Sequence, residues 1–297
     1  MKDRKTFMVG AVLMGIALAF GAAPSSAQVH PYNAAPAFDP DATMSPGAII
    51  SNGTIMLGVV DQGQLNEAGG TASICGNTGV GMRYEPHNSE STSPGCWCEG
   101  WGVADGVTGV FGQANVAAGN INVTDESFVS TASTATSVVT VGGDFRVTHD
   151  YFPSATPYLY ECEVTIENIS GVDMADLRYT RAMDWDTEPT PFSEYVTIQG
   201  TALATNVLYA HDDGFEATNP LAPRSPIIAE GDFIDSGPAD HGALFDFGFG
   251  ALAAGESHTF STFYGAAPSE IDALNALATV NAEVYSSDGA GVAAAEV

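Results

Sequence analysis

Three carboxylates lie within five residues at Asp184, Asp186 and Glu188, in the run Met-Asp-Trp-Asp-Thr-Glu. In a loop at the end of a strand, alternate carboxylates of this kind could converge on a hard cation. Calcium takes six to eight oxygen ligands at about 2.3–2.6 Å and accepts irregular loops. The spacing lacks the glycine and the distal glutamate of an EF-hand, so it predicts a calcium site of no recognised loop type. In the alternative interpretation, Asp184 or Asp186 pairs with Arg178 or Arg181, and the sequence leaves both open.

Three tryptophans suggest a different chemistry. Trp97 and Trp101 lie in a glycine-rich stretch, and Trp185 lies between two acids. Exposed indole faces stack on sugar rings, and nearby carboxylates accept hydrogen bonds from hydroxyls. These residues are therefore candidates for carbohydrate binding, with core filling as the alternative.

Catalytic chemistry has little support in the sequence. Two further acidic clusters, at 211–216 and 232–241, are of the kind that chance produces in an acidic chain. A Gly-x-Ser-x-Gly elbow is absent from the sequence, and Asp240–His241 has no identifiable serine partner. We interpret His149 and His241 as structural, name no catalytic residue, and leave open whether the protein is an enzyme.

Four cysteines, Cys75, Cys96, Cys98 and Cys162, allow up to two disulfides in an oxidising compartment. A separation of one residue is unfavourable for a bridge between Cys96 and Cys98. We therefore expect at least one of them to pair with Cys75 or Cys162. A zinc site at the Cys-x-Cys motif, or free buried thiols, are the alternatives.

Residues 1–27 have the three parts of a secretory signal peptide: a basic start, a short apolar run and small residues at Ser25 and Ala27. The apolar run, 7–20, is shorter than the roughly 20 residues that span a bilayer. We expect cleavage after Ala27, a location outside the cell or in the periplasm, and no membrane span in the mature chain.

The mature chain is strongly acidic. Of 8 basic residues three lie in the leader, which leaves five arginines and no lysine against 35 of the 36 acids. Such a surface repels nucleic acid, so nucleic-acid binding is excluded as a function. Either a saline habitat or loops that bind cations would explain this excess of acidic residues.

The remaining pattern predicts an all-β fold. Residues 28–47 are expected to be extended, 48–286 to form the domain, and 287–297 to be a loose tail. Short apolar runs alternate with glycine, asparagine and aspartate, as in antiparallel sheets. The clearest strand is 158–167, where charged and apolar residues alternate strictly.

Ser269 caps one expected helix at 269–282, with Ile271, Leu274 and Leu277 on one face. We expect a single large antiparallel β-sandwich, supersandwich-like, with this one late helix. The other expected strands are 54–61, 79–85, 106–113, 137–150, 176–185, 195–209, 242–249 and 258–264.

Several stretches together resemble a group of exported bacterial β-sandwich proteins that often end in PEP-CTERM or VPLPA-type sorting tails. The stretches are 51–59, 94–103, 147–154, 177–186, 238–247 and 263–267. The resemblance covers most of the mature chain, and it implies export and a β-sandwich but no established activity. Because 290–297 contain no proline-containing sorting motif, we expect secretion rather than surface anchoring.

Together these features predict a secreted or cell-surface structural or adhesive matrix protein, with calcium as a possible stabilising ion. Its expected partners are extracellular polysaccharide or matrix proteins. A carbohydrate-binding or polysaccharide-degrading protein on the same scaffold is the alternative.

Overall fold

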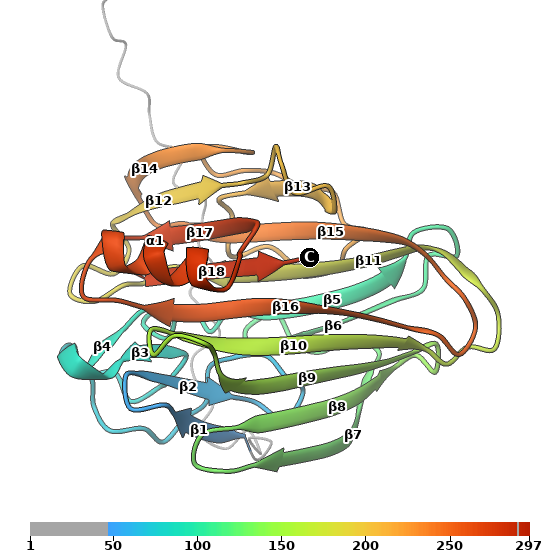
Figure 1. Cartoon of the computed structure of the whole chain (residues 1–297), viewed down its shortest axis with the longest axis horizontal. Helices are drawn as coiled ribbons and strands as arrows, with labels where there is room; N and C mark the ends of the chain where they lie inside the picture. Colours follow the sequence, from blue (N-terminus) through green and yellow to red (C-terminus); the bar gives the residue numbers. More distant parts are fainter. Residues whose placement is uncertain (1–46, 290) are drawn as a thin grey trace, which may run out of the picture. The chain divides into compact units, whose positions relative to one another are not determined.

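The computed structural model describes residues 47–289 and 291–297, which form three antiparallel sheets and one α-helix (Figure 1). The all-β prediction with one late helix is confirmed. The expected signal peptide, and all of the expected extended segment except residue 47, lie outside the described residues.

The largest sheet has nine strands. Their order is β14 (Phe233–Ala239), β12 (Glu194–Gln199), β17 (Val284–Asp288), β18 (Gly291–Glu296), β16 (Ser257–Ala266), β10 (Leu159–Asn168), β9 (Phe145–Pro153), β8 (Ala135–Val141) and β7 (Val123–Ser130).

Two smaller sheets complete the fold. The five-stranded sheet has the order β13 (Val207–His211), β15 (Gly242–Leu252), β11 (Met174–Asp184), β5 (Gly100–Asp105) and β6 (Phe111–Asn115). The four-stranded sheet runs β1 (Ala48–Ser51), β2 (Ile55–Val59), β3 (Met82–Tyr84) and β4 (Ser89–Glu90), with the 3-10 helix η1 (Glu85–His87) between β3 and β4.

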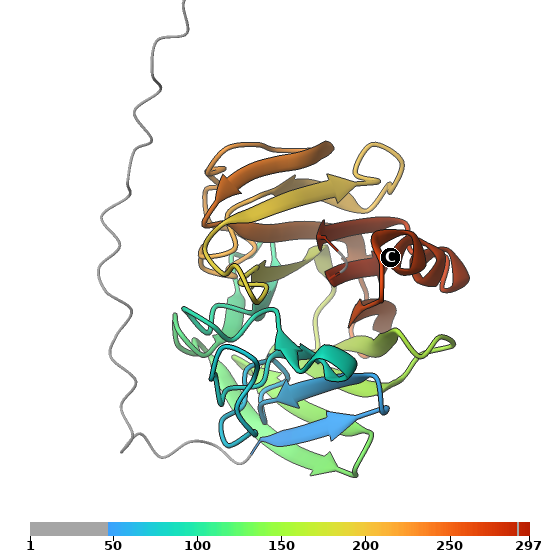
Figure 2. The same cartoon turned by 90° about the vertical axis from the view of Figure 1, so that its left-hand side faces the viewer.

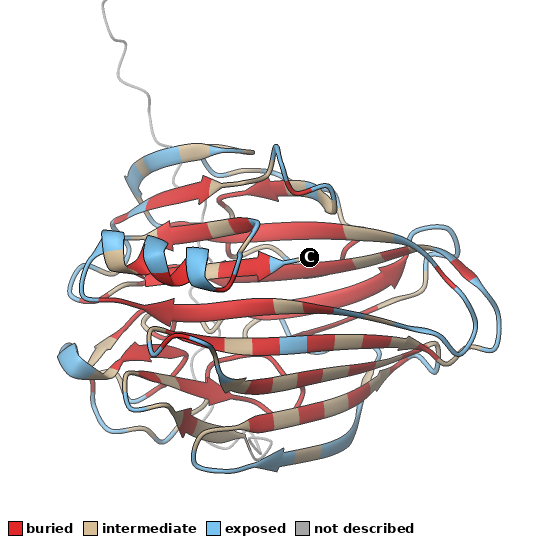
Figure 3. Ribbon diagram, viewed as in Figure 1, coloured by how far each residue is buried: buried red, intermediate tan, exposed pale blue. Residues whose placement is uncertain are grey.

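Alternation of side chains along the strands places the core. In β10, Cys162, Val164 and Ile166 are fully buried, whereas the residues between them are partly or fully exposed. Successive residues of a strand point to opposite faces, so one face of β10 packs inward. Figure 3 shows the same alternation along β8 and β9.

Aromatic contacts join the two larger sheets as the layers of a sandwich. Tyr179 of β11 meets Phe260 of β16 edge-on, with ring centroids 5.1 Å apart. Phe247 of β15 lies 6.3 Å from the same ring. Edge-to-face pairs of this kind add about 0.5–1.5 kcal/mol beyond the area that they bury.

A buried ion pair lies at the centre of this interface. Arg181 of β11 donates from Nε to Glu99 Oε1 at 2.5 Å, and both side chains are almost completely buried. The hydroxyl of Tyr151 in β9 accepts from Arg181, and that of Tyr264 in β16 donates to Glu99. The backbone N–H of Leu65 donates to the other Glu99 oxygen. Hydrogen bonds to both partners offset the desolvation that such a pair costs.

The helix α1 (Glu270–Thr279) begins where the sequence predicts, because Ser269 Oγ accepts from the N–H of Asp272. Its expected apolar face is partly wrong. Ala273, Ala276 and Leu277 are buried, whereas Ile271 is 71% exposed. Figure 2 shows α1 on the outer side of the β17–β18 hairpin, where it covers Val292 and Ala294 of β18.

Two expected strands are in fact pairs of strands. The stretch 137–150 contains the turn between β8 and β9, and 195–209 contains the turn between β12 and β13. Gly142 and Gly143 have φ of +59° and +84° in the first turn, a conformation that glycine adopts without strain. The strand expected at 106–113 is also displaced, since β5 ends at Asp105 and β6 begins at Phe111.

The expected loose tail is wrong. Strands β17 and β18 occupy the middle of the nine-stranded sheet, with β12 on one side and β16 on the other. The small residues of 291–295 fit this place because β18 is covered on both faces, by α1 and by the main core. The small side chains of 291–295 therefore reflect close packing and not a lack of structure.

Val292→Asp tests the central position of β18. Val292 is 1% exposed beneath α1, and an unpaired buried carboxylate costs several kcal/mol. We expect thermal unfolding monitored by circular dichroism to show a large loss of stability. Val172→Asp, in an exposed turn, is the matched control and should change little. Equal, small effects of both substitutions would mean that residues 291–297 do not form this strand.

Candidate metal centre

Strand register brings two aspartates distant in sequence to one point. Asp184 is the last residue of β11 and pairs with Gly242, the first residue of β15. Asp240, in the turn that leads into β15, therefore comes beside it. Asp186 follows in the loop after β11, and one oxygen from each of the three aspartates lies within 4.8 Å of the other two.

Two of these carboxylates are inside the protein without ordinary partners. Asp184 is 1% exposed and Asp186 is fully buried, while Asp240 is exposed. Within residues 47–289 and 291–297, Asp184 Oδ1 and both oxygens of Asp186 have no hydrogen-bond partner. Glu194, at the start of β12, is 2% exposed, and its two oxygens are likewise unpartnered in this part of the chain. Buried polar atoms are normally hydrogen-bonded, so this group of unpartnered oxygens needs an explanation.

Burial and mutual repulsion both favour the protonated forms. Burial raises the pKa of Asp184 well above its ordinary value, and repulsion from Asp186 and Asp240 adds to the effect. Burial, with repulsion from Glu194 and Asp240, raises the pKa of Asp186 to about 8. Burial raises the pKa of Glu194 to about 7, and Asp288 and Asp240 contribute further repulsion. Near neutral pH these acids must hold protons or share a cation.

The five arginines between residues 47 and 297 are engaged elsewhere. The pairs are Arg83 with Glu90, Arg146 with Glu126 and Glu167, Arg178 with Asp176, Arg181 with Glu99, and Arg224 with Asp246. The alternative interpretation, in which Asp184 or Asp186 pairs with Arg178 or Arg181, is therefore wrong. His241 lies nearby, but its ring nitrogens face Asp212 Oδ2 and the carbonyl of Glu194.

The spacing of the oxygens suits a hard divalent ion. Oxygens on opposite sides of a calcium ion, each at about 2.3–2.6 Å, are about 4.6–5.2 Å apart, and adjacent ligands are closer. The three aspartates meet this limit. The charge of Glu194 repels both buried aspartates and so adds to the negative potential at the cluster.

Glu188, the third predicted ligand, lies elsewhere. Its Oε1 accepts from Ser73 Oγ at 2.5 Å, and its Oε2 accepts from the N–H of Glu90 at 3.0 Å. The side chain thus fastens the loop after β11 to β4 and is not available to the cluster. Asp240 takes the place that spacing alone assigned to Glu188, because the pairing of β11 with β15 decides which acids meet.

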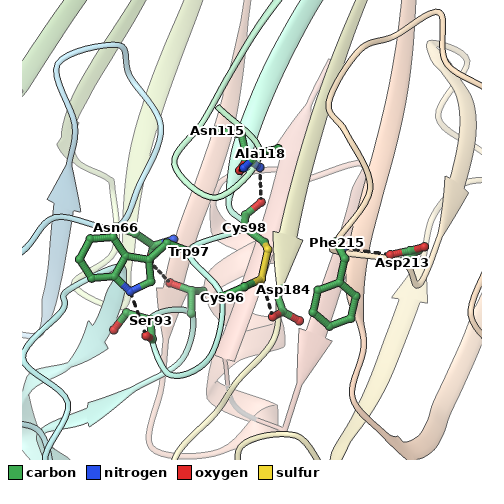
Figure 4. The surroundings of a disulfide bond; sticks show 11 residues. Asn66, Ser93, Cys96, Trp97, Cys98, Asn115, Ala118, Asp184, Asp213 and Phe215 are labelled. Atoms are coloured by element: carbon green, nitrogen blue, oxygen red, sulfur yellow. Dashed lines mark hydrogen bonds between the residues drawn. A yellow bond between two sulfur atoms is a disulfide. The ribbon is translucent and has the colours of Figure 1, made fainter. Parts of the chain in front are cut away.

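The disulfide prediction is wrong in its pairing. Cys96 bonds to Cys98, whose Cα atoms lie 5.2 Å apart, within the range that disulfides require. Cys75 is free and exposed, and Cys162 is free and buried in β10. Figure 4 shows the Cys96 sulfur facing Asp184, whose Oδ2 is 3.3 Å away. The disulfide therefore borders the acidic cluster.

Two of the three predicted sugar-stacking tryptophans are in the core. Trp101 and Trp185 are fully buried, and their indole N–H groups donate to the carbonyl of Gln62 and to Ser286 Oγ. They cannot present a face to a ligand, so core filling is the correct interpretation for both. Trp97 is half-buried, with its N–H donated to the carbonyl of Ser93.

The two histidines singled out by the sequence are buried and hydrogen-bonded. His149 Nε2 lies 3.0 Å from the Tyr179 hydroxyl, and burial keeps the pKa of His149 well below its usual value. His241 Nδ1 lies 3.0 Å from Asp212 Oδ2. These contacts suit structural histidines that orient neighbouring strands.

A polar pocket of about 210 Å³ lies apart from the acidic cluster. Its lining is rich in amide side chains, including Gln62, Gln64, Asn66 and Asn120, with Glu67 among them. No motif in the sequence marks this pocket, because its residues come from separate loops.

Comparisons with known proteins give no family: no protein-family model matches the chain, and no curated protein matches it. The geometry of the site therefore carries the functional argument.

The acidic cluster predicts an unusual pH dependence in the presence of a chelator. A carboxyl group with a raised pKa keeps its proton in the folded state but loses it on unfolding, so stability falls as pH rises towards the folded value. Between about pH 6.5 and 8.5 we expect the unfolding free energy to drop, by up to about 1.4 kcal/mol per pH unit for each retained proton. Urea unfolding across this range measures the slope.

Asp186→Asn should flatten this slope, because its amide does not titrate and the pKa of Asp186 is about 8. Glu163→Gln, at an exposed site on β10, should leave the slope unchanged. An identical slope in both variants would show that Asp186 is not the titrating group.

Proposed function

We propose that this protein is a secreted or cell-surface structural or adhesive matrix protein whose β-sandwich is stabilised by calcium held between Asp184, Asp186 and Asp240. One observation carries the proposal: two buried carboxylates with unpartnered oxygens meet a third, and all five arginines of the described residues are engaged elsewhere. Desolvated carboxylates require a compensating charge or a proton, and a calcium ion supplies the charge.

The position of the site explains why an ion there would stabilise the fold. Asp184 and Asp240 border β11 and β15 of the five-stranded sheet. Asp186 lies in the loop that leads to β12, which is next to the edge strand β14 of the nine-stranded sheet. An ion bound by all three would tie the two layers together at this end of the sandwich.

A matrix role agrees with the rest of the chain. The leader pattern favours export, and the acidic surface favours calcium-dependent association with polysaccharide or other matrix proteins. Among the described residues, no helix has the length and apolar character needed to cross a bilayer.

Calcium should raise the melting temperature of the mature protein more than sodium does at equal ionic strength. General screening depends only on ionic strength, whereas a site that binds only the folded state adds RT ln(1 + [L]/Kd), about 2.7 kcal/mol at 100 times Kd. Differential scanning calorimetry in the two salts measures the difference.

Asp184→Asn together with Asp186→Asn should abolish the calcium-specific increment and retain the sodium response. The double variant Glu163→Gln with Glu296→Gln removes the same charge from exposed positions and should keep the increment. If sodium protects the unmodified protein as well as calcium does, the proposed ion site is wrong.

Carbohydrate binding is the second candidate, and the amide-lined pocket favours it. Amides both donate to and accept from hydroxyl groups, and this pocket contains no arginine or lysine.

A polysaccharide pull-down with Val116→Arg tests carbohydrate binding at this pocket, since the long side chain would fill the pocket. We expect Val116→Arg to weaken capture about tenfold, while Val129→Arg, exposed on β7, leaves capture intact. Equal capture by both variants would exclude this pocket.

A further inference from the structure

Asp184 belongs to two ligand sets at once. With Asp186 and Asp240 it forms the all-oxygen group described above. On its other side, Asp184 forms a second group with the sulfurs of Cys96 and Cys98, again with all ligand atoms within 4.8 Å. All three members of this second group are buried. Figure 4 shows the two cysteines and Asp184 facing one another across a short gap.

We propose that reduction of the Cys96–Cys98 disulfide opens a second metal site, in which the two thiolates and Asp184 bind a zinc-like cation. Zinc takes thiolate and carboxylate ligands in tetrahedral sites. Asp186 or Asp240, both within reach of Asp184, supplies the fourth ligand. The inference rests on the proposed function only through Asp184, which both sites share, and it does not require calcium to bind.

The chemistry balances with a dithiol as the reductant. Its two S–H groups become one disulfide, and the Cys96–Cys98 bond takes up the two electrons and two protons to give two thiols. Binding of the metal then releases these two protons to solvent, together with the proton that Asp184 holds when it is protonated, because thiolates and carboxylates are the forms that ligate zinc. In the oxidised protein the sulfurs carry no charge, and only the oxygen set remains.

The local structure holds the cysteine loop in place. The carbonyl of Cys98 accepts from Asn115 Nδ2 at 2.7 Å, and the indole of Trp97 donates to the carbonyl of Ser93 at 3.1 Å. Neither contact depends on the disulfide bond, so the loop keeps both sulfurs beside Asp184 after reduction. A Cys96 thiol at 3.3 Å from Asp184 Oδ2 is already at hydrogen-bonding distance for sulfur.

Cadmium is a suitable probe, because its thiolate complexes absorb in the ultraviolet by charge transfer from sulfur. In this assay a water-soluble phosphine reduces the mature protein, because a dithiol reductant would itself bind cadmium. The phosphine takes its oxygen from water and becomes the phosphine oxide. Anaerobic titration of the reduced protein should give the band with one equivalent of cadmium. The oxidised protein, folded and unaltered in sequence, should give none.

Variants assign the ligands. Cys75→Ser together with Cys162→Ser should keep the band, whereas Cys96→Ser together with Cys98→Ser should lose it. Asp184→Asn should weaken cadmium binding about tenfold or more, and Asp173→Asn, at an exposed turn, should leave the affinity unchanged.

Two results would overturn the inference. The first is a reduced protein that keeps its circular dichroism spectrum but shows no cadmium band. The second is a band of equal size in the Cys96→Ser, Cys98→Ser variant. The calcium measurement is made on the oxidised protein, so each proposal can fail while the other stands.

Discussion

Positive charge is scarce in this protein, and the number of arginines limits how many buried acids can form an ion pair. After the predicted leader the chain carries five arginines and no lysine against 35 acids. Each arginine is engaged with at least one acid, and Arg181 is the one placed at the centre of the sandwich. Most other acids face water, where hydration and salt compensate them. Acids that the fold draws inward without an arginine need other hydrogen-bond donors, as Glu188 and Asp212 have, or else a proton or a metal ion.

Two buried acidic sites show the difference. Glu99 is satisfied by Arg181, the Tyr264 hydroxyl and a backbone N–H, so its charge is part of the packing between sheets. Asp184 and Asp186 have no comparable set of donors. The first arrangement is complete within the chain, as expected for a structural ion pair. The second lacks such donors among the described residues, and this lack is the physical basis for proposing that it binds a cation.

The sequence predicts the local pattern well and the long-range pairing poorly. Strict alternation in 158–167 identifies β10, and Ser269 correctly marks the start of α1. Alternation continues through the turn at Gly142 and so hides the break between β8 and β9. Asp184 and Asp186 are separated by one residue, so the sequence pattern predicts them, whereas Asp240 joins them only through the register of β11 with β15. The Cys96–Cys98 bond depends on loop geometry that spacing alone does not define.

The place of the C-terminal hairpin has a consequence for how the chain folds. Strands β17 and β18 separate β12 from β16, so the nine-stranded sheet remains two unconnected parts until residues 284–296 have left the ribosome. Half of its pairings also join strands that are not consecutive in the sequence, and such contacts form slowly. The sheet is therefore completed only when the β17–β18 hairpin pairs with β12 on one side and with β16 on the other.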